Sequence, residues 1–287
     1  MKVLLLGANS QLGWELQRTC PEKIQLISCD YPKVDFCSKT SIKQCLETSK
    51  PDCIINAAAY TAVDLAEKEI QTAFKVNHEA VADIAQYAGQ NDIRLVHIST
   101  DYVFNGKNYR PWTIEDSPCP ESVYGKSKLE GEIAVRDILK NKALIIRTAW
   151  LYSSHGENFV KTMLKLITKK NSLNVVDDQV GTPTWAYGLA KGVWEFIEKS
   201  LSGIFHWTDA GIASWYDFAI AIQEEAMGLG LITKTIPILP ISSKEFPTPA
   251  QRPFYGILDK NMTWKTTAGL NPVHWRVQLR AMLKELN

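Results

Sequence analysis

The sequence carries almost no excess charge of either sign. Its 32 Lys and Arg residues are balanced by 31 Asp and Glu residues, so the formal net charge is +1 at pH 7. A near-neutral chain lacks the broad basic surface that is typical of nucleic-acid-binding and membrane-binding proteins. We therefore expect no nucleic-acid and no membrane partner. A local basic pocket for a small anionic ligand remains compatible with this balance.

Long apolar runs are also absent, and no stretch approaches the roughly 18 consecutive apolar residues of a membrane-spanning helix. Lys2 followed by the apolar residues 3–6 looks superficially like a secretion signal. A glycine turn follows too soon, however, and no small-residue cleavage site is present. The sequence therefore predicts a cytoplasmic protein.

The sequence lacks the spacings that are typical of metal sites. It contains no Cys-x-x-Cys, and no histidine lies among the five cysteines of the first 53 residues. Cys29 and Cys53 fall in predicted strands and Cys45 in a predicted helix. This pattern favours small apolar side chains in a reducing compartment over a zinc site or disulfides, which stay the minor alternative.

The apolar pattern of the chain predicts an α/β fold. Five short apolar segments alternate with helical patterns, and they lie near residues 2–6, 24–29, 52–56, 93–98 and 143–147. Such alternation is typical of a Rossmann-like, doubly wound parallel sheet with helices on both faces.

The pattern loosens after Arg147 and indicates a second, smaller region. We predict a dinucleotide-binding domain over residues 1–150, with 171–200 returning to it, and a C-terminal substrate-binding domain over 151–170 and 201–287. A strand is expected near 203–207. The stretch 236–253 holds five prolines and is predicted to be a loop that lines a substrate pocket.

A glycine-rich turn joins the first strand to the first helix, with the sequence Gly-Ala-Asn-Ser-Gln-Leu-Gly from Gly7 to Gly13. Backbone N–H groups in such a turn, together with the helix N-terminus, suit a pyrophosphate. Gly7 permits the tight turn and Gly13 permits close packing of helix on strand. Ser10 stands where related loops usually have glycine. An ordinary tight turn is the alternative.

Asp30 ends the second strand, about 20 residues after the turn, where an acidic residue can bind the adenosine ribose hydroxyls. Its charge would repel a 2′-phosphate, which favours NADH over NADPH, although Lys33 lies close enough to blunt that preference. A solvated loop carboxylate is the alternative.

Tyr124 and Lys128 lie four residues apart in a predicted helix, so their side chains share one face. A nearby ammonium is expected to lower the tyrosine pKa from about 10. The pair can then exchange a proton with a carbonyl or alcohol oxygen, as hydride transfer to or from the adjacent carbon requires. Thr100, at the carboxyl end of the fourth strand, is placed to hydrogen-bond the same oxygen. His97, inside that strand, is predicted to be a packed residue rather than a base.

These motifs together resemble the extended short-chain dehydrogenase/reductase family, and within it the enzymes that reduce sugars carried on dTDP. The matching segments run in order along nearly the whole chain: 7–17, 56–67 (NAAAYTAVDLAE), 99–104 (STDYVF), 124–132 (YGKSKLEGE), 147–152 (RTAWLY), 178–184 (DQVGTPT) and 247–253 (PTPAQRP).

The resemblance implies a role for each matching position. Tyr124 is the expected proton donor, Lys128 its partner and a ligand of the nicotinamide ribose, and Thr100 the third catalytic residue. Substrate contacts are expected from Asp101 and Trp150, and from Arg252 beside the diphosphate; core packing of Trp150 and a surface ion pair of Arg252 are the alternatives. The other expected cofactor contacts are Gly7, Ser10, Gln11, Leu12, Gly13, Asp30, Asp35, Phe36, Ala59, Tyr60 and Thr61.

Tyr102 separates two related chemistries. Nucleotide-sugar dehydratases of the superfamily carry an Asp-Glu pair after the threonine, whereas Asp101 here is followed by Tyr102. The resemblance therefore implies plain reduction, in which NADH or NADPH gives hydride to C4 of a 4-keto-6-deoxy sugar on dTDP. Two alternatives stay open: a different nucleotide ketosugar, or a non-catalytic, dinucleotide-binding regulatory subunit. Use of Mg²⁺ and formation of a homodimer also stay open, although the sequence offers no metal-ligand cluster.

Overall fold

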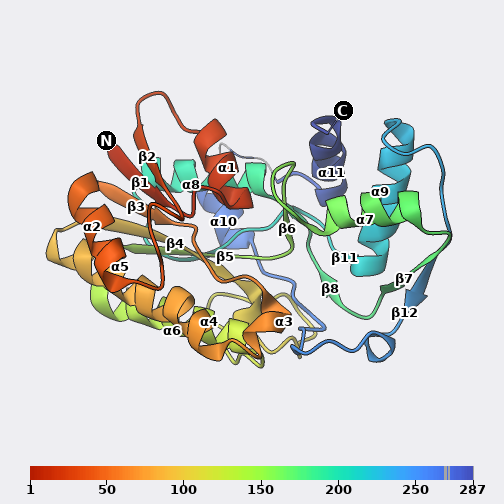
Figure 1. The fold of residues 1–287 in the computed structure, drawn as a ribbon, viewed down its shortest axis with the longest axis horizontal. Coiled ribbons are helices and arrows are strands. Elements are labelled where there is room, and N and C mark those ends of the chain that lie inside the picture. The colour runs from red at the N-terminus through yellow and green to blue at the C-terminus, as the bar shows by residue number, and fades with distance from the viewer. Residues whose placement is uncertain (268–269, 271, 287) are drawn as a thin grey trace.

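A six-stranded parallel sheet forms the centre of the larger half of the molecule (Figure 1). The computed structural model describes residues 1–267, 270 and 272–286. The strand order is β10-β5-β4-β3-β1-β2. Its strands are β1 (Lys2–Leu6), β2 (Gln25–Cys29), β3 (Cys53–Asn56), β4 (Arg94–Thr100), β5 (Ala143–Thr148) and β10 (Gly203–His206). The predicted α/β class and the five predicted strands are confirmed, with bounds within two residues of those expected.

Helices cover both faces of this sheet because alternate strand residues point to opposite sides. Leu12 and Leu16 of α1 (Gln11–Arg18) and Val193 of α8 (Ala186–Glu198) pack on one face. The other face is covered by α2 (Lys39–Ser49), α5 (Ala80–Gln90) and α6 (Val123–Leu139). The order of the strands reverses at β1, which lies between β2 and β3. Open sheets of this kind bind ligands in the crevice beyond the carboxyl ends of the strands at such a point.

The smaller half lies on the C-terminal side and has a core of its own (Figure 1). It is built from α7 (Phe159–Lys169), α9 (Trp215–Gly228) and α11 (Trp275–Lys284), with β7 (Leu173–Val176) paired to β12 (Ile238–Ile241). Aromatic side chains, among them Tyr152, Phe218 and Trp275, fill much of this core.

Short elements connect the two halves and the remaining chain. They are α3 (Val63–Ala66), α4 (Ile70–Phe74), η1 (Lys75–Glu79), η2 (Asp101–Val103), η3 (Lys140–Lys142), β6 (Leu151–Tyr152), β8 (Val180–Gly181), β9 (Thr184–Trp185), β11 (Ala213–Ser214), η4 (Ser243–Glu245) and α10 (Asn261–Thr266).

The structure differs from the expected division of the chain in three places. β10 was assigned to the smaller domain but pairs with β5 as the edge strand of the main sheet. Of the segment 171–200, α8 returns to the main sheet as expected, whereas β7 pairs with β12 in the smaller half. β12 itself lies in the proline-rich stretch predicted as a loop; Pro240 is tolerated there because β12 has a single neighbouring strand.

Among the described residues, no helix combines the length and the apolar character that crossing a bilayer requires. All six cysteines are free thiols; Cys53 is buried in the core, whereas Cys37 and Cys119 are exposed.

Candidate functional site

Thr100 and Tyr124 meet at the carboxyl end of β4. Thr100 is the last residue of that strand, and its hydroxyl lies within hydrogen-bonding reach of the Tyr124 phenol in the first turn of α6. Ser122 caps α6 by accepting the N–H of Gly125 at 3.1 Å, and Glu67 accepts the N–H of Val123 at 2.8 Å. These caps fix the helix end that presents Tyr124.

Burial raises the pKa of Tyr124 above its usual value, the Thr100 hydrogen bond lowers it, and the neighbouring Asp101 and Tyr102 raise it. Lys128 does not contribute to this shift, contrary to the expectation that its ammonium lowers the tyrosine pKa. Lys128 Nζ instead donates to the backbone oxygen of Ile98 on β4 at 2.6 Å.

Lys128 is buried, with 2% of its surface exposed. Burial lowers its pKa to about 8, while the charge of Glu132, one turn further along α6, acts in the opposite direction. The amine therefore changes charge close to neutral pH instead of near 10, which makes its proton exchangeable in the working range of an enzyme.

Asp101 adds a buried carboxyl group to the site. Thr100 Oγ1 donates to Asp101 Oδ1 at 3.1 Å, and burial raises the pKa of Asp101 to about 7 despite that hydrogen bond. The neighbouring Tyr102 packs edge-on against the ring of Tyr124, with ring centres 5.4 Å apart. Tyr102, the residue that distinguishes this chain from the dehydratases, thus lies against the proposed proton donor.

Arg252 reaches the same cluster from the other half of the molecule. Its Nη2 donates to Asp64 Oδ2 of α3 at 2.6 Å, and its Nη1 lies 3.4 Å from the Tyr102 hydroxyl. Arg252 also lines a largely apolar cavity of about 380 Å³, whose other walls include Phe159 and Trp215. Arg252 is therefore both an ion-pair partner, as the alternative expected, and a cation beside the Thr100–Tyr124 cluster.

Trp150 lies next to this cavity. Its indole stacks on that of Trp215 with ring centres 3.5 Å apart. Its backbone has φ of +47°, a conformation that costs a non-glycine residue energy and is held by its surroundings. Trp150 is therefore packed against another side chain, as the alternative expected, and it touches the cavity wall through Trp215.

The glycine-rich turn has the geometry that the sequence indicated. Gly7 has φ of +83°, and a Cβ on it would lie 2.4 Å from the backbone nitrogen of Ala58. A Cβ on Gly13 would lie 2.1 Å from the Gly7 oxygen, so helix and strand touch there. Ser10 caps α1 by accepting the N–H of Gly13 at 2.9 Å. The side chain of Leu12 is buried in the core, so its backbone N–H is what it can offer a phosphate.

The loops after β2 and β3 lie beside this turn. Asp30 Oδ2 accepts the N–H of Asn9 at 2.7 Å, which places the carboxylate at the turn as a ribose ligand requires. After β3, Tyr60 is held by Asn77, whose Oδ1 accepts the Tyr60 N–H at 2.9 Å. Asn77 Nδ2 lies 3.0 Å from Ser127 Oγ. Asn77 was missed by sequence reasoning, because an asparagine inside a helical pattern gives no local signal.

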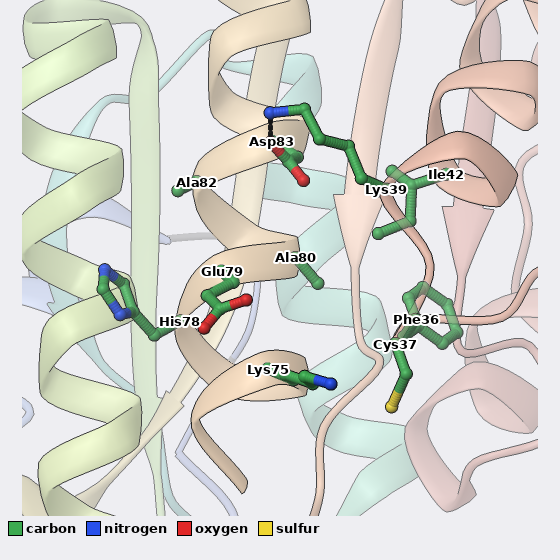
Figure 2. Close-up of a pocket in the computed structure, with 10 residues that line it drawn as sticks. All are labelled: Phe36, Cys37, Lys39, Ile42, Lys75, His78, Glu79, Ala80, Ala82 and Asp83. Carbon is green, nitrogen blue, oxygen red and sulfur yellow. Dashed lines mark ion pairs between the residues drawn. The ribbon is translucent and has the colours of Figure 1, made fainter. Parts of the chain in front are cut away.

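Asp35 and Phe36 precede α2. The Asp35 carboxylate accepts the N–H of Cys37 at 2.8 Å. Phe36 lines a cavity of about 350 Å³ between the start of α2 and the helical turns of η1 and α5, which Figure 2 shows with the Lys39–Asp83 ion pair of 2.6 Å across it. Tyr124, Lys128 and Thr100 do not line this cavity, so the cavity does not bring Phe36 together with them.

The described part of the chain contains no group of three or more His, Cys, Asp or Glu side chains arranged to hold a metal ion. Gln11, a predicted cofactor contact at the start of α1, is bound to the smaller half of the molecule. Its Oε1 accepts a hydrogen bond from Asn158 Nδ2 at 3.0 Å.

Comparison with known proteins places these features in context. The family model described as RmlD substrate binding domain matches residues 1–287. The spore coat polysaccharide biosynthesis protein SpsK of Bacillus subtilis is 39% identical over 99% of this chain and 97% of its own length. The dTDP-4-dehydrorhamnose reductase of Escherichia coli K12 is 37% identical over 100% of this chain and 98% of its own.

Solved structures give the same result. A dTDP-4-dehydrorhamnose reductase from Clostridium acetobutylicum is 40% identical with a TM-score of 0.92, covering 100% of this chain and 99% of that one. The enzyme of that name from Bacillus anthracis, in complex with NADP, is 35% identical with a TM-score of 0.92, covering 99% of each chain.

Proposed function

Because this chain belongs to the dTDP-4-dehydrorhamnose reductase family of NAD(P)H-dependent oxidoreductases, we propose that it reduces the C4 keto group of dTDP-4-dehydro-L-rhamnose to give dTDP-L-rhamnose. Its small-molecule partners are then a dTDP-sugar and a nicotinamide dinucleotide. The observation that carries the proposal is the packing of Tyr124 against Tyr102 at the end of β4, beside Thr100, Asp101 and the Arg252 guanidinium.

The residues around the glycine-rich turn fit a dinucleotide. The N-terminus of α1 offers backbone N–H groups to a pyrophosphate, and Asp30 lies beside the turn at the position of a ribose ligand. When bound, the reduced nicotinamide supplies the hydride to C4. Ala59, Tyr60 and Thr61, which follow β3 beside the same turn, are proposed as further contacts.

Tyr124 is the proposed proton donor. As C4 accepts hydride, its carbonyl oxygen gains negative charge, and the phenol proton transfers to it. Thr100 is proposed to orient that oxygen through its hydroxyl, and Lys128, while protonated, to stabilise the negative charge that develops. Asp101 and Trp150 are proposed to contact the sugar, and Arg252 to bind the diphosphate through its planar fork.

The test is a direct assay with analysis of the product. Purified protein is mixed with NADH or NADPH and dTDP-4-dehydro-L-rhamnose, loss of the reduced-nicotinamide absorbance is followed, and the product is identified by NMR. We expect oxidation of the cofactor with formation of dTDP-L-rhamnose. Absence of oxidation over a range of pH and with or without Mg²⁺ would overturn the proposal.

One finding favours a second candidate. The relative SpsK is named for spore coat polysaccharide rather than for rhamnose, at an identity similar to that of the named reductases. Turnover of another nucleotide ketosugar in the same assay would select this reading. Binding of dinucleotide without turnover of any ketosugar would select the regulatory subunit. A homodimer remains a prediction, which analytical ultracentrifugation tests.

A further inference from the structure

His97 lies between two polar side chains in the interior of the main half. It is fully buried in β4, in agreement with its prediction as a packed residue. Its Nδ1 lies 3.3 Å from Asn56 Nδ2 of β3, and its Nε2 lies 3.4 Å from Lys128 Nζ of α6. Both ring nitrogens therefore face a nitrogen of another side chain, which restricts where protons can reside.

Asn56 determines the tautomer of this ring. Asn56 Oδ1 accepts the backbone N–H of Ala58 at 3.2 Å, so its NH₂ group is directed toward His97. His97 Nδ1 must then be the acceptor. Burial and the charge of Lys128 hold the pKa of His97 well below its usual value, so the ring is neutral and carries a single proton. That proton is on Nε2.

The Nε2–H group points at Lys128. An ammonium has donors and no acceptor, whereas an uncharged amine has a lone pair that can accept the Nε2 proton. The Ile98 oxygen, 2.6 Å from Nζ, is the acceptor that the ammonium has on β4. The charge of Glu132 on α6 raises the pKa of Lys128 and so favours the ammonium. The Glu132 carboxylate is itself bound by Arg147 of β5, whose Nη2 donates to it at 2.7 Å.

We propose that His97 is a positioning residue for Lys128: fixed as its Nε2–H tautomer by Asn56, it holds the amine against β4 and favours its uncharged form. This inference rests on the proposed function, because Lys128 matters to the reaction as the partner of Tyr124. It follows that His97 helps to set the pH above which Lys128 loses its proton and the site loses its positive charge.

The first test needs no substrate, and a variant enters only to assign the signals. Ligand-free protein with ¹⁵N-labelled histidine is studied by NMR, and the His97 signals are assigned by their loss in His97→Asn. We expect a neutral ring protonated on Nε2 from pH 6 through pH 9. A ring protonated on Nδ1, or a charged imidazolium at neutral pH, would overturn the inference. Because no sugar is involved, this outcome is independent of whether the proposed function holds.

The second test uses the pH dependence of kcat/KM. In His97→Gln the side-chain amide can turn its oxygen toward Nζ and accept from the ammonium, so the high-pH limb should move up by about one pH unit. His97→Asn retains the contact with Asn56 but does not reach Lys128. It should move the limb by less. His274→Gln, at an exposed histidine, is the matched control and should leave the limb in place.

Lys128→Met separates a positioning role from a general structural one. In Lys128→Met the high-pH fall of kcat/KM that the amine causes is absent. Adding His97→Gln to this variant should therefore not shift the pH profile of its remaining activity. An unchanged limb in a His97→Gln protein that folds and binds cofactor like the wild type would show that His97 serves packing alone. If the His97 variants fail to fold, the His97 signals are assigned by elimination, from Gln variants of the other four histidines, and the NMR result on the unaltered chain decides.

Discussion

The phenol of Tyr124 keeps its proton at neutral pH. Burial raises its pKa above the usual value, and the Thr100 hydroxyl alone among the neighbouring groups acts in the opposite direction. A donor must hold its proton until negative charge develops on the substrate oxygen, so this state suits reduction. The reverse oxidation would first need that pKa lowered, by movement of the Lys128 ammonium toward the phenol.

Tyr124→Phe should therefore remove proton transfer and leave the binding of cofactor intact. We expect kcat to fall by about 10²–10⁴-fold, the usual contribution of a positioned proton donor, with an unchanged Kd for the reduced cofactor by fluorescence titration. Tyr109→Phe, at a side chain that is 92% exposed, serves as the control. Near-normal turnover in Tyr124→Phe would exclude the proposed role.

Asp101 gives stability a pH dependence of defined sign. Burial raises its pKa from 3.8 to about 7, so between about pH 4 and 7 the folded state holds a proton that the unfolded state has lost. The free energy of unfolding due to this group therefore falls as pH rises through that window. Asp101→Asn should flatten the fall measured by urea unfolding at pH 5 and pH 7.5, although Asp209, also raised to about 7, keeps part of it.

Asp116 is the control of opposite sign. The hydrogen bond from Arg110 lowers the pKa of its carboxyl group, so the stability it contributes is present above the unfolded pKa and is lost as pH falls. Asp116→Asn should thus leave the slope between pH 5 and 7.5 nearly unchanged. Equal slopes for wild type and Asp101→Asn would contradict the assignment to Asp101.

Residues whose role depends on local sequence were predicted well, and those that depend on long-range contacts were not. The tight turn at Gly7 and the close packing of helix on strand at Gly13 follow from spacing within a few residues. The contact of His97 with Lys128 joins residues 31 apart, and that of Asn77 with Ser127 joins residues 50 apart. Neither contact leaves a mark on its own neighbourhood in the sequence, so burial of His97 was predictable and its partners were not.

At the scale of elements, the junction of β1 and α1 is the most constrained. A Cβ on Gly13 would lie 2.1 Å from the Gly7 oxygen, so Gly13→Ala must push the helix from the strand. We expect a loss of about 1–3 kcal/mol in the free energy of unfolding, typical of an overpacked site, and at least a roughly tenfold weaker binding of cofactor, because the helix N-terminus would move away from the phosphates.

Gly228→Ala provides the comparison within the same chain. Gly228 ends α9, and no atom lies within 4 Å of a Cβ placed there. This variant should be slightly stabilised, by about 0.5–1 kcal/mol. Urea unfolding and cofactor titration of both variants provide the measurement. Equal stabilities and equal cofactor affinities of Gly13→Ala and Gly228→Ala would mean that the close contact of Gly13 with the turn is not needed for either property.

Element type was easier to predict than element partnership. The apolar pattern and length of residues 203–206 predicted a strand, but a four-residue sequence does not indicate which strand it pairs with. β10 pairs with β5 because α8, which precedes it, packs across the face of the main sheet. The proline content of residues 236–253 suggested a loop, yet β12 forms there because β7 offers it backbone hydrogen bonds.

At the scale of the molecule, Arg252 and Asp64 join the two halves beside the site. Their ion pair of 2.6 Å connects the segment before α10 with α3. Arg252→Gln should raise KM for the dTDP-sugar about tenfold or more, the effect of losing a charged hydrogen bond to phosphate, without changing the Kd for the cofactor. Arg110→Gln, which breaks another Arg–Asp pair, is the matched control and should leave both constants unchanged. A rise in cofactor Kd with no rise in KM would place Arg252 elsewhere.

The edge position of β10 has a consequence for how the chain is made. A ribosome releases β5 long before residues 203–206, and it synthesises α7, β7 and α8 in between. In the complete fold every residue of β5 is buried. Until β10 is made, however, one side of β5 has no partner strand, and open strand edges of this kind are the surfaces through which nascent chains aggregate. A fragment that stops at residue 150 would keep that edge open, so we expect it to aggregate more readily than the full chain.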